Sequence, residues 1–322
     1  MSAASELRLA EVVELRELRP EDLQPLLARE IDEWRAELDW DFRPSADLVR
    51  RFVGMRALSG HALVAGGRVT GYAYSVADER KGLVGDLYVL HEHRTVENEN
   101  RLLDALLGGF MHTPYLYRIE CQLMLLSSPF ERLLPHAQYL SRYPRWFMAI
   151  ETDRILRMLP GPAAVRYLVE EWNSRRQGDA AQVISAAYQG HIDSSINDQY
   201  RSVAGARRFL TNIVQYPGCG TFFQPASFVA LDPHTGRLCG VSLASLLAAD
   251  VGHLTQICVA PEIRKTGVGY ELLRRSLASL ARAGCRKASL TVTAENREAI
   301  RLYERIGFRN VRSFAAFVWE GW

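Results

Sequence analysis

The sequence contains two similar segments at a constant separation of 170 positions. The run that begins at Leu87 aligns with the run that begins at Ile257. The matched pairs are Val89 and Val259, Glu92 and Glu262, Arg94 and Arg264, Leu102 and Leu272, and Leu103 and Leu273. A glycine-turned hairpin pattern precedes both runs, at residues 61–75 and 228–243. Because each copy is long enough to form a domain, the repeat predicts two units of the same fold.

The chain of 322 residues has room for two such units. The segment Leu-Pro-Gly-Pro-Ala at residues 159–163 is rich in residues that interrupt helices and strands. We therefore expect one domain over residues 1–158 and a second over residues 163–322.

Composition excludes several classes of protein. Hydrophobic residues make up 48% of the chain, which indicates a globular core, but nowhere do eighteen apolar residues run together, so no membrane span is expected. The formal net charge is only +2, so no nucleic-acid surface is expected either. Residues 1–9 lack the basic and apolar regions of a signal peptide. The five cysteines are scattered and odd in number, which favours free thiols over disulfides or a metal site. A cytoplasmic location follows from these features.

A strand, a loop and a helix follow one another in the second copy. Residues 254–259 form a short apolar run that Pro261 ends, and residues 270–281 carry leucines at helical spacing. Arg264 and Lys265 lie in the loop between them, before Gly267 and Gly269. The unpaired amides at a helix start, two positions without side chains and two cations together favour a bound diphosphate.

The spacing of this loop excludes two common phosphate-binding motifs. No Walker A string occurs, and Leu272 occupies the place of the third glycine in a dinucleotide fingerprint. What fits is the pattern Arg-x-x-Gly-x-Gly, which begins at Arg264.

A second pattern follows the next strand, which we expect over residues 288–293. It reads Asn-x-x-Ala-x-x-x-Tyr-x-x-x-Gly-Phe from Asn296 to Phe308. Together, the two patterns resemble the acetyl-CoA loop and the following helix of the GNAT superfamily of N-acetyltransferases, over residues 163–322. The resemblance implies an α/β (α+β) fold in which each domain has a mixed, mostly antiparallel sheet flanked by helices, and it implies acetyl-CoA as cosubstrate.

The resemblance also assigns residues to the site. Pantetheine would lie along Ile257, Cys258 and Val259, where two strands separate. The diphosphate would bind the loop residues Arg264, Lys265, Thr266, Gly267, Val268 and Gly269. Helical spacing places Asn296 and Tyr303 on one face, so both can line the cleft. Asn296 would bind the cosubstrate or cap the helix, and Tyr303 would give a proton to the departing thiolate.

Other roles stay open. His253, Asp250 or a chain of waters could serve as general base, because no residue matches a fixed motif for one. The polar loop at residues 190–200 contains Asp193 and Asp198, whose charges could attract a substrate ammonium.

The first copy departs from both patterns at the positions that would bind acetyl-CoA. Glu97 and Glu99 stand at the two glycine positions, so negative charge and side chains occupy the phosphate site. The segment at residues 127–139 lacks both the Asn and the closing Gly-Phe. We expect this domain to be degenerate and not to bind acetyl-CoA in the usual manner.

The expected function is N-acetylation of a primary amine by the second domain. The tandem layout is similar to that of mycothiol synthase, which implies a small-molecule acceptor. Two alternatives are acetylation of a protein N-terminus or lysine, and a non-catalytic module that senses acyl-CoA or serves assembly. Neither nucleic acid nor membrane is expected as a partner.

Overall fold

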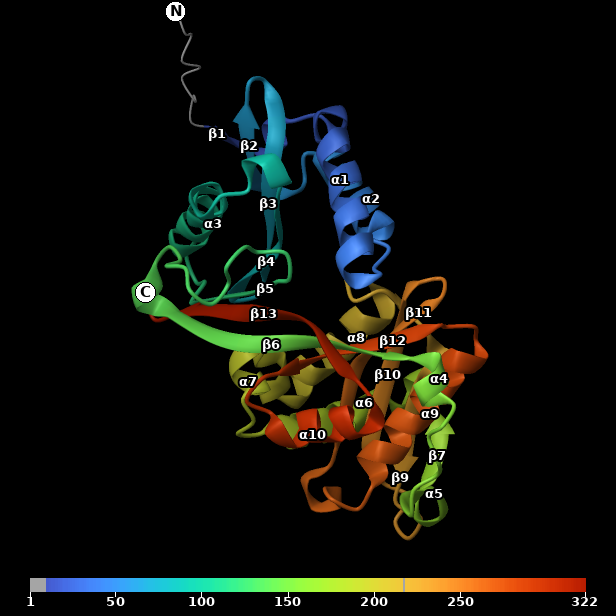
Figure 1. Ribbon diagram of the computed structural model, residues 1–322. Coiled ribbons are helices and arrows are strands. Elements are labelled where there is room, and N and C mark those ends of the chain that lie inside the picture. Colours follow the sequence, from blue (N-terminus) through green and yellow to red (C-terminus); the bar gives the residue numbers. More distant parts are fainter. Residues whose placement is uncertain (1–9, 217) are drawn as a thin grey trace, which may run out of the picture. The chain divides into compact units, whose positions relative to one another are not determined.

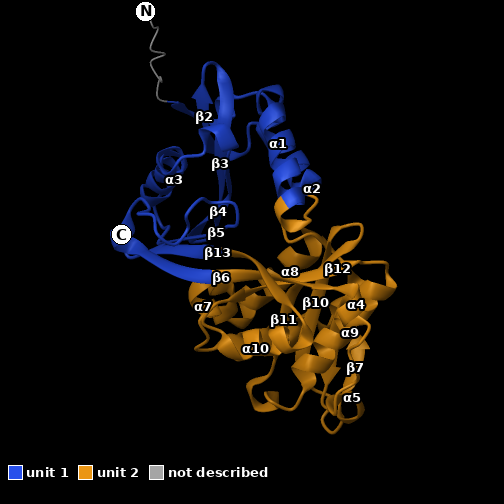
Figure 2. Cartoon of the chain, viewed as in Figure 1, with its two compact units in different colours: residues 1–36, 42–144, 314–322 blue, residues 37–41, 145–313 orange. Residues whose placement is uncertain are grey.

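The computed structural model describes residues 10–216 and 218–322, and these divide into two compact units (Figure 2). The first unit comprises the described residues up to Ala36 together with Phe42–Pro144 and Phe314–Trp322. The second comprises Glu37–Asp41 and Arg145–Ser313. Residues 1–9, where the sequence shows no signal peptide, lie outside the described residues. No helix in the described part of the chain combines the length and apolar character that a membrane span needs.

The units do not follow the boundary expected between residues 158 and 163, because two strands pass from one unit to the other. Strand β6 (Leu140–Glu151) pairs from Arg145 onward with β12 (Lys287–Thr293) of the second unit. Strand β13 (Arg309–Glu320) pairs from Ala315 onward with β5 (Arg118–Leu123) of the first. Each half of the sequence thus supplies a strand to the unit built mainly by the other half.

The first unit is a sheet with helices (Figure 1). Its strand order is β1-β2-β3-β4-β5-β13, antiparallel except for the parallel pair β4–β5. Its main elements are β1 (Glu11–Glu14), α1 (Pro20–Leu38), α2 (Arg43–Gly54), β2 (Ser59–Ala65), β3 (Arg68–Asp78), β4 (Lys81–Val89) and α3 (Val96–Met111).

The second unit has the same plan, with strand order β6-β12-β11-β10-β9-β7 and β8 paired to β10. The pair β11–β12 is parallel, and the other neighbours are antiparallel. Its elements are α4 (Thr152–Ile155), α5 (Ala163–Arg166), β7 (Leu168–Glu171), α6 (Gln177–Tyr188), α7 (Asp193–Ile196), α8 (Val203–Gln215), β8 (Thr221–Phe222), β9 (Phe228–Leu231), β10 (Leu238–Ala248), β11 (Val251–Val259), α9 (Val268–Arg282) and α10 (Arg297–Ile306).

The repeat seen in the sequence is also a structural repeat. Strands β10 and β11 have the bounds of β3 and β4 shifted by 170 positions. Each hairpin carries a bulge at the same place, with Gly85 unpaired in the first unit and Thr255 in the second. The mixed, mostly antiparallel sheet flanked by helices is therefore present in both units, as expected.

The leucine spacing correctly predicted helix α9. Leu272, Leu273, Leu277 and Leu280 are all fully buried in the second unit. Burial of four leucines on one face fixes how the helix lies on the sheet, because each contributes about 1.5–3 kcal/mol of hydrophobic free energy. The start of α9 is thereby held at the end of β11.

In the first unit, the protein's own carboxylate lies at the start of the corresponding helix. Thr95 caps α3 by accepting a hydrogen bond from the Asn98 amide. Glu99 is buried and accepts a hydrogen bond of 2.5 Å from the Arg132 guanidinium, with each side chain only 1% exposed. Ser127 also donates to Glu99 from its amide, at 3.2 Å, and from its hydroxyl. The charge that a phosphate would carry is thus supplied internally.

Replacement of Glu99 by Gln should lower the free energy of unfolding by about 3–5 kcal/mol, because the Arg132 charge would stay buried without a carboxylate. Urea unfolding measures this change. The control Glu97→Gln alters an exposed carboxylate two residues away and should shift the midpoint little. Equal midpoints for the two variants would contradict the role given to the buried pair.

A second buried pair of acids lies in the first unit. Glu30 and Asp86 share a hydrogen bond, and the Tyr72 hydroxyl donates to Glu30 at 2.9 Å. Burial raises the pKa of Asp86 to about 6, although the Glu30 side chain and the Leu87 amide lower it. Burial, and then the charge of Asp86, raises the pKa of Glu30 well above its usual value. Asp86 is therefore protonated well below pH 6 and acquires a buried charge as the pH rises through about 6.

The folded pKa of Asp86 exceeds the unfolded value, so the protonated carboxyl favours the folded state near pH 4. This contribution to the free energy of unfolding is lost as the pH rises to about 6. Asp86→Asn cannot ionise and should gain about 1–3 kcal/mol over the natural protein between pH 4 and pH 7.5. Urea unfolding at both pH values tests this, with the exposed Asp32→Asn as control. A difference between Asp86→Asn and the natural protein that is independent of pH would contradict the assignment.

Candidate active site

The site is created where the parallel strands β11 and β12 separate. Their pairing runs from Val251–Lys287 to Leu254–Leu290 and stops there, although the strands continue to Val259 and Thr293. The outer edges remain paired, since β10 follows β11 to its end and β6 follows β12 to Thr293. The facing edges therefore offer main-chain groups to an extended ligand.

A cavity of about 1130 Å³ lies at this opening, within the second unit. Its lining includes the strand residues Ile257, Cys258 and Val259, the loop residues Arg264, Lys265, Gly267 and Gly269, and the helix residues Asn296 and Tyr303. Both patterns found in the sequence thus meet at one cavity. The volume is at the upper end of the range for small-molecule pockets.

Two of the expected loop residues do not line the cavity. The Thr266 hydroxyl donates to the Ile263 carbonyl at 2.7 Å, and this contact shapes the turn. Val268 is buried in the apolar core beneath the loop. These two positions hold the loop, and their neighbours face the cavity.

The loop presents the start of α9 without a side-chain cap. Gly267 is the N-cap residue, with φ of 92° and ψ of −1°, and it offers no side-chain acceptor. A side chain at Gly269 would point toward Val259, 3.8 Å from its nearest carbon. The first amides of α9 are therefore exposed to a ligand, and the positive end of the helix dipole favours an anion there.

The two cations of the loop have different surroundings. The Arg264 guanidinium donates from Nη2 to the Ala187 carbonyl at 2.6 Å, and so links the loop to the end of α6. Lys265 adopts the left-handed conformation with φ of 65°. Its ammonium makes no hydrogen bond or ion pair with the described residues. Lys265 is thus the cation that can turn to a phosphate.

Asn296 caps α10 and also faces the cavity. Its Oδ1 accepts a hydrogen bond from the Ala299 amide at 3.2 Å, which is the capping alternative. Its Nδ2 lies 3.4 Å from Nε2 of His191. The side chain therefore fixes the helix start with one atom and contributes to the cavity wall with the other.

Tyr303 lies on the wall of the cavity and is 7% exposed. Burial, and then the nearby Asp193 carboxylate, raises the pKa of Tyr303. Its hydroxyl has no hydrogen-bond partner among the described residues. A phenol with these properties stays protonated at neutral pH and can donate to a ligand.

Neither side chain considered as general base lies in the cavity lining. His253 is 3% exposed, stacks on Phe147 and contacts the Ser289 hydroxyl at 2.9 Å. Burial, and then the charge of Arg145, lowers the pKa of His253 to about 3. Burial therefore argues against His253 as the general base. Asp250 lies in a turn and is paired with Arg286 at 2.8 Å.

His191 is a cavity residue that sequence reasoning missed. It lies in the polar loop before α7, and its ring meets the edge of Tyr188. Its Nδ1 accepts a hydrogen bond from the Asp193 amide at 3.2 Å and lies 3.7 Å from the Asp193 carboxylate. The sequence drew attention to the acids of this loop, but nothing in it marked His191 as their partner.

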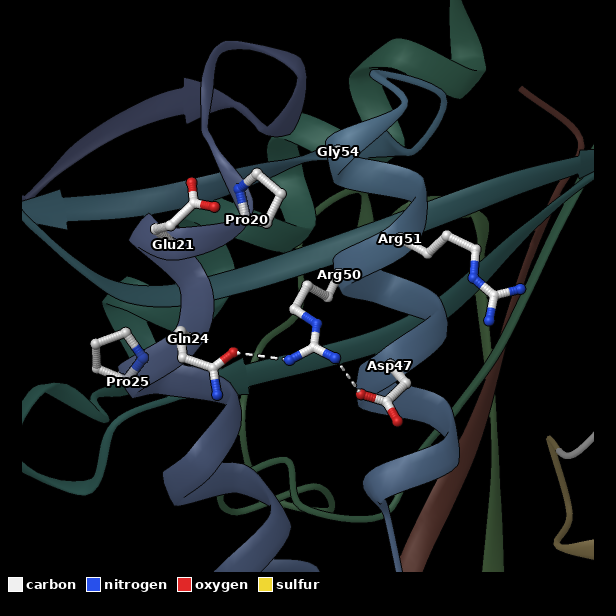
Figure 3. Close-up of a pocket in the computed structure, with 8 residues that line it drawn as sticks. All are labelled: Pro20, Glu21, Gln24, Pro25, Asp47, Arg50, Arg51 and Gly54. Atoms are coloured by element: carbon white, nitrogen blue, oxygen red, sulfur yellow. Dashed lines mark hydrogen bonds and ion pairs between the residues drawn. The ribbon is translucent and has the colours of Figure 1, made fainter.

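A second hollow, of about 830 Å³, lies in the first unit between α1 and α2 (Figure 3). Arg50 donates to Gln24 at 3.2 Å and to Asp47 at 2.8 Å across its lining. Because an anion would have to displace these contacts, this hollow is a poor candidate for a phosphate site.

Comparison with known proteins agrees with this geometry. Residues 194–308, which contain most of the cavity lining, match the acetyltransferase (GNAT) family. The match therefore places a GNAT acetyltransferase domain at residues 194–308 of the second unit. GNAT enzymes use acetyl-CoA, and the uncapped helix, the two glycines and the separated strands provide what its diphosphate and pantetheine need. No curated protein matches the chain.

Solved structures extend the fold to the whole chain. A GCN5-related N-acetyltransferase from Sphaerobacter thermophilus has a TM-score of 0.68 at 18% identity, covering 97% of this chain and 95% of that one. A tandem GNAT protein from the clavulanic acid biosynthesis pathway has a TM-score of 0.61 at 17% identity, covering 97% and 98%. A glucosamine N-acetyltransferase region of a fungal multi-domain protein has a TM-score of 0.59 at 15% identity, covering 99% and 39%. At these identities the likeness concerns the fold alone, which both halves of the chain share with these structures.

Gly267→Ala should weaken acetyl-CoA binding about tenfold or more, because a Cβ at this φ strains the loop that presents the helix amides. Isothermal titration should give one site per chain for the natural protein. Gly284 has the same φ of 92° and lies outside the cavity lining, so Gly284→Ala imposes similar backbone strain. If both variants lost the same affinity for acetyl-CoA, backbone strain in general would explain the loss, and the loop at Gly267 would have no special role.

Proposed function

We propose that this protein transfers the acetyl group of acetyl-CoA to the primary amine of a small molecule, in the cavity of the second unit. The observation that carries the proposal is the meeting of three features at one cavity. These are the separated ends of β11 and β12, the uncapped start of α9 and the Tyr303 side chain in the cavity wall.

Each part of the reaction has a group in the cavity. A main-chain amide of residues 257–259 would donate to the thioester oxygen as charge develops there, and one such donor is worth about 3 kcal/mol. The amine nitrogen bonds to the carbonyl carbon, the carbon–sulfur bond breaks, and Tyr303 gives its phenolic proton to the sulfur. The proton that the ammonium must lose passes to the Asp193 carboxylate beside the cavity, because the Nδ1 lone pair of His191 already accepts a hydrogen bond from the Asp193 amide.

The surroundings of Asp193 support an amine acceptor. Asp193 accepts a hydrogen bond from the Thr293 hydroxyl at the end of β12, and its side chain is 15% exposed. A fixed carboxylate of this kind attracts an ammonium to the separated strands. Two structural neighbours are described as a glucosamine N-acetyltransferase region and a tandem protein of clavulanic acid biosynthesis. Those descriptions favour a small acceptor over a protein for this chain as well.

Tyr303→Phe should lower kcat by about 100-fold and leave acetyl-CoA affinity within about twofold, because only the proton is lost. Thiol release from acetyl-CoA in the presence of a panel of amines measures turnover. Tyr167→Phe removes a hydroxyl from the same unit outside the cavity lining and is the control. An unchanged kcat in Tyr303→Phe would refute the proton-donor role, and thiol release with no amine of the panel would count against the proposed function.

A further inference from the structure

The segment that joins the two halves of the sequence forms one wall of the cavity. Arg154, Arg157 and residues 158–162 line it, although the family match begins only at residue 194. The Tyr270 hydroxyl of α9 donates to the Leu159 carbonyl at 2.8 Å, which fixes the segment beside the phosphate loop. This wall lies outside the residues that the family match covers.

The wall carries two arginines, and a third arginine of the lining lies on α10. Arg154 and Arg157 lie in the lining with Arg305 of α10, and Glu298 is the acidic residue among the described lining residues. The stem of Arg154 lies beside Gly307, where a Cβ would come within 3.6 Å of it. The cations are therefore placed near the end of α10, whereas the diphosphate loop lies at the start of α9.

These arginines are available to a ligand. Arg154 forms no ion pair or side-chain hydrogen bond within residues 10–216 and 218–322. Arg157 lies 3.6 Å from Asp153, but the two side chains are 71% and 59% exposed, so solvent screens that pair. Arginine is well suited to phosphate, because its planar guanidinium can donate two parallel hydrogen bonds.

The same wall also offers apolar surface. Met158, Leu159 and Pro160 line the cavity between the arginines and Tyr270, and Leu159 is 76% exposed. An exposed leucine beside a proline and an arginine provides a platform for a flat, weakly polar ring. A ring and a phosphate close together are the features of the nucleotide end of CoA.

We propose that the segment 154–162 binds the 3′-phosphoadenosine end of acetyl-CoA, with Arg154 and Arg157 on the 3′-phosphate and residues 158–160 against the adenine. This inference rests on the proposed function and extends it to residues outside the matched domain. It makes the connection between the two halves of the sequence a part of the cosubstrate site.

The test compares acetyl-CoA with acetyl-3′-dephospho-CoA by isothermal titration of the full chain. The natural protein should bind acetyl-CoA about tenfold or more tightly than the dephospho compound. In Arg154→Gln/Arg157→Gln that preference should fall to about twofold or less, with affinity for the dephospho compound unchanged. Arg154→Lys/Arg157→Lys keeps both charges and should retain part of the preference.

The control Arg237→Gln/Arg282→Gln removes two exposed charges outside the cavity lining and should keep the full preference. Thermal melting of each variant reports folding. The proposal would be overturned if Arg154→Gln/Arg157→Gln kept the full preference for acetyl-CoA over the dephospho compound. It would also be overturned if only Arg305→Gln lost that preference. If the natural protein bound neither compound, the proposed function itself would fail.

Discussion

The active site depends on the early end of one parallel strand pair. Beyond Leu254 and Leu290, β11 and β12 each remain paired on their outer edge, and within residues 10–216 and 218–322 no strand pairs with the edges that face each other. A bulge at Thr255 adds a residue to β11 just after the last paired position and so redirects the strand. Buried main-chain groups must find partners, and a ligand that runs between the strands supplies them. Helix α9, with its four buried leucines, then holds the anion-binding loop at the end of the same strand.

The two units share the elements that surround the site, and they differ in the side chains at the start of the helix. Both have the bulged hairpin, the parallel pair and the following helix. In the first unit Thr95 caps that helix and Glu99 is bound to Arg132, whereas in the second unit Gly267 and Gly269 leave the helix start open. The side chain next to the bulge also differs, since Asp86 of the buried acid pair stands 170 positions before the uncharged Gln256. At the start of this helix, side chains thus distinguish the closed first unit from the open second one.

The exchange of strands gives the first half of the sequence a place in the catalytic unit. Residues from Arg145 onward pair with the full length of β12, and Arg145 itself stands opposite Thr293 at the edge of the separated strands. Its Nη2 donates to the Thr291 hydroxyl at 3.3 Å. The connection that follows, at residues 154–162, lines the cavity. The halves of the sequence therefore do not correspond to separable domains, and the second half alone would lack a strand and a wall of its site.

The sequence by itself determined the repeated fold, the strand–loop–helix segment and the positions of Gly267, Asn296 and Tyr303, because these depend on local spacing and on residues close together in the chain. Only the tertiary structure decided the rest. The strand exchange, the burial of His253, the approach of His191 to Asn296 and the cationic wall all join residues far apart in the sequence. Such contacts are decided by how strands pair and by which side chains lose water, and no local pattern records either.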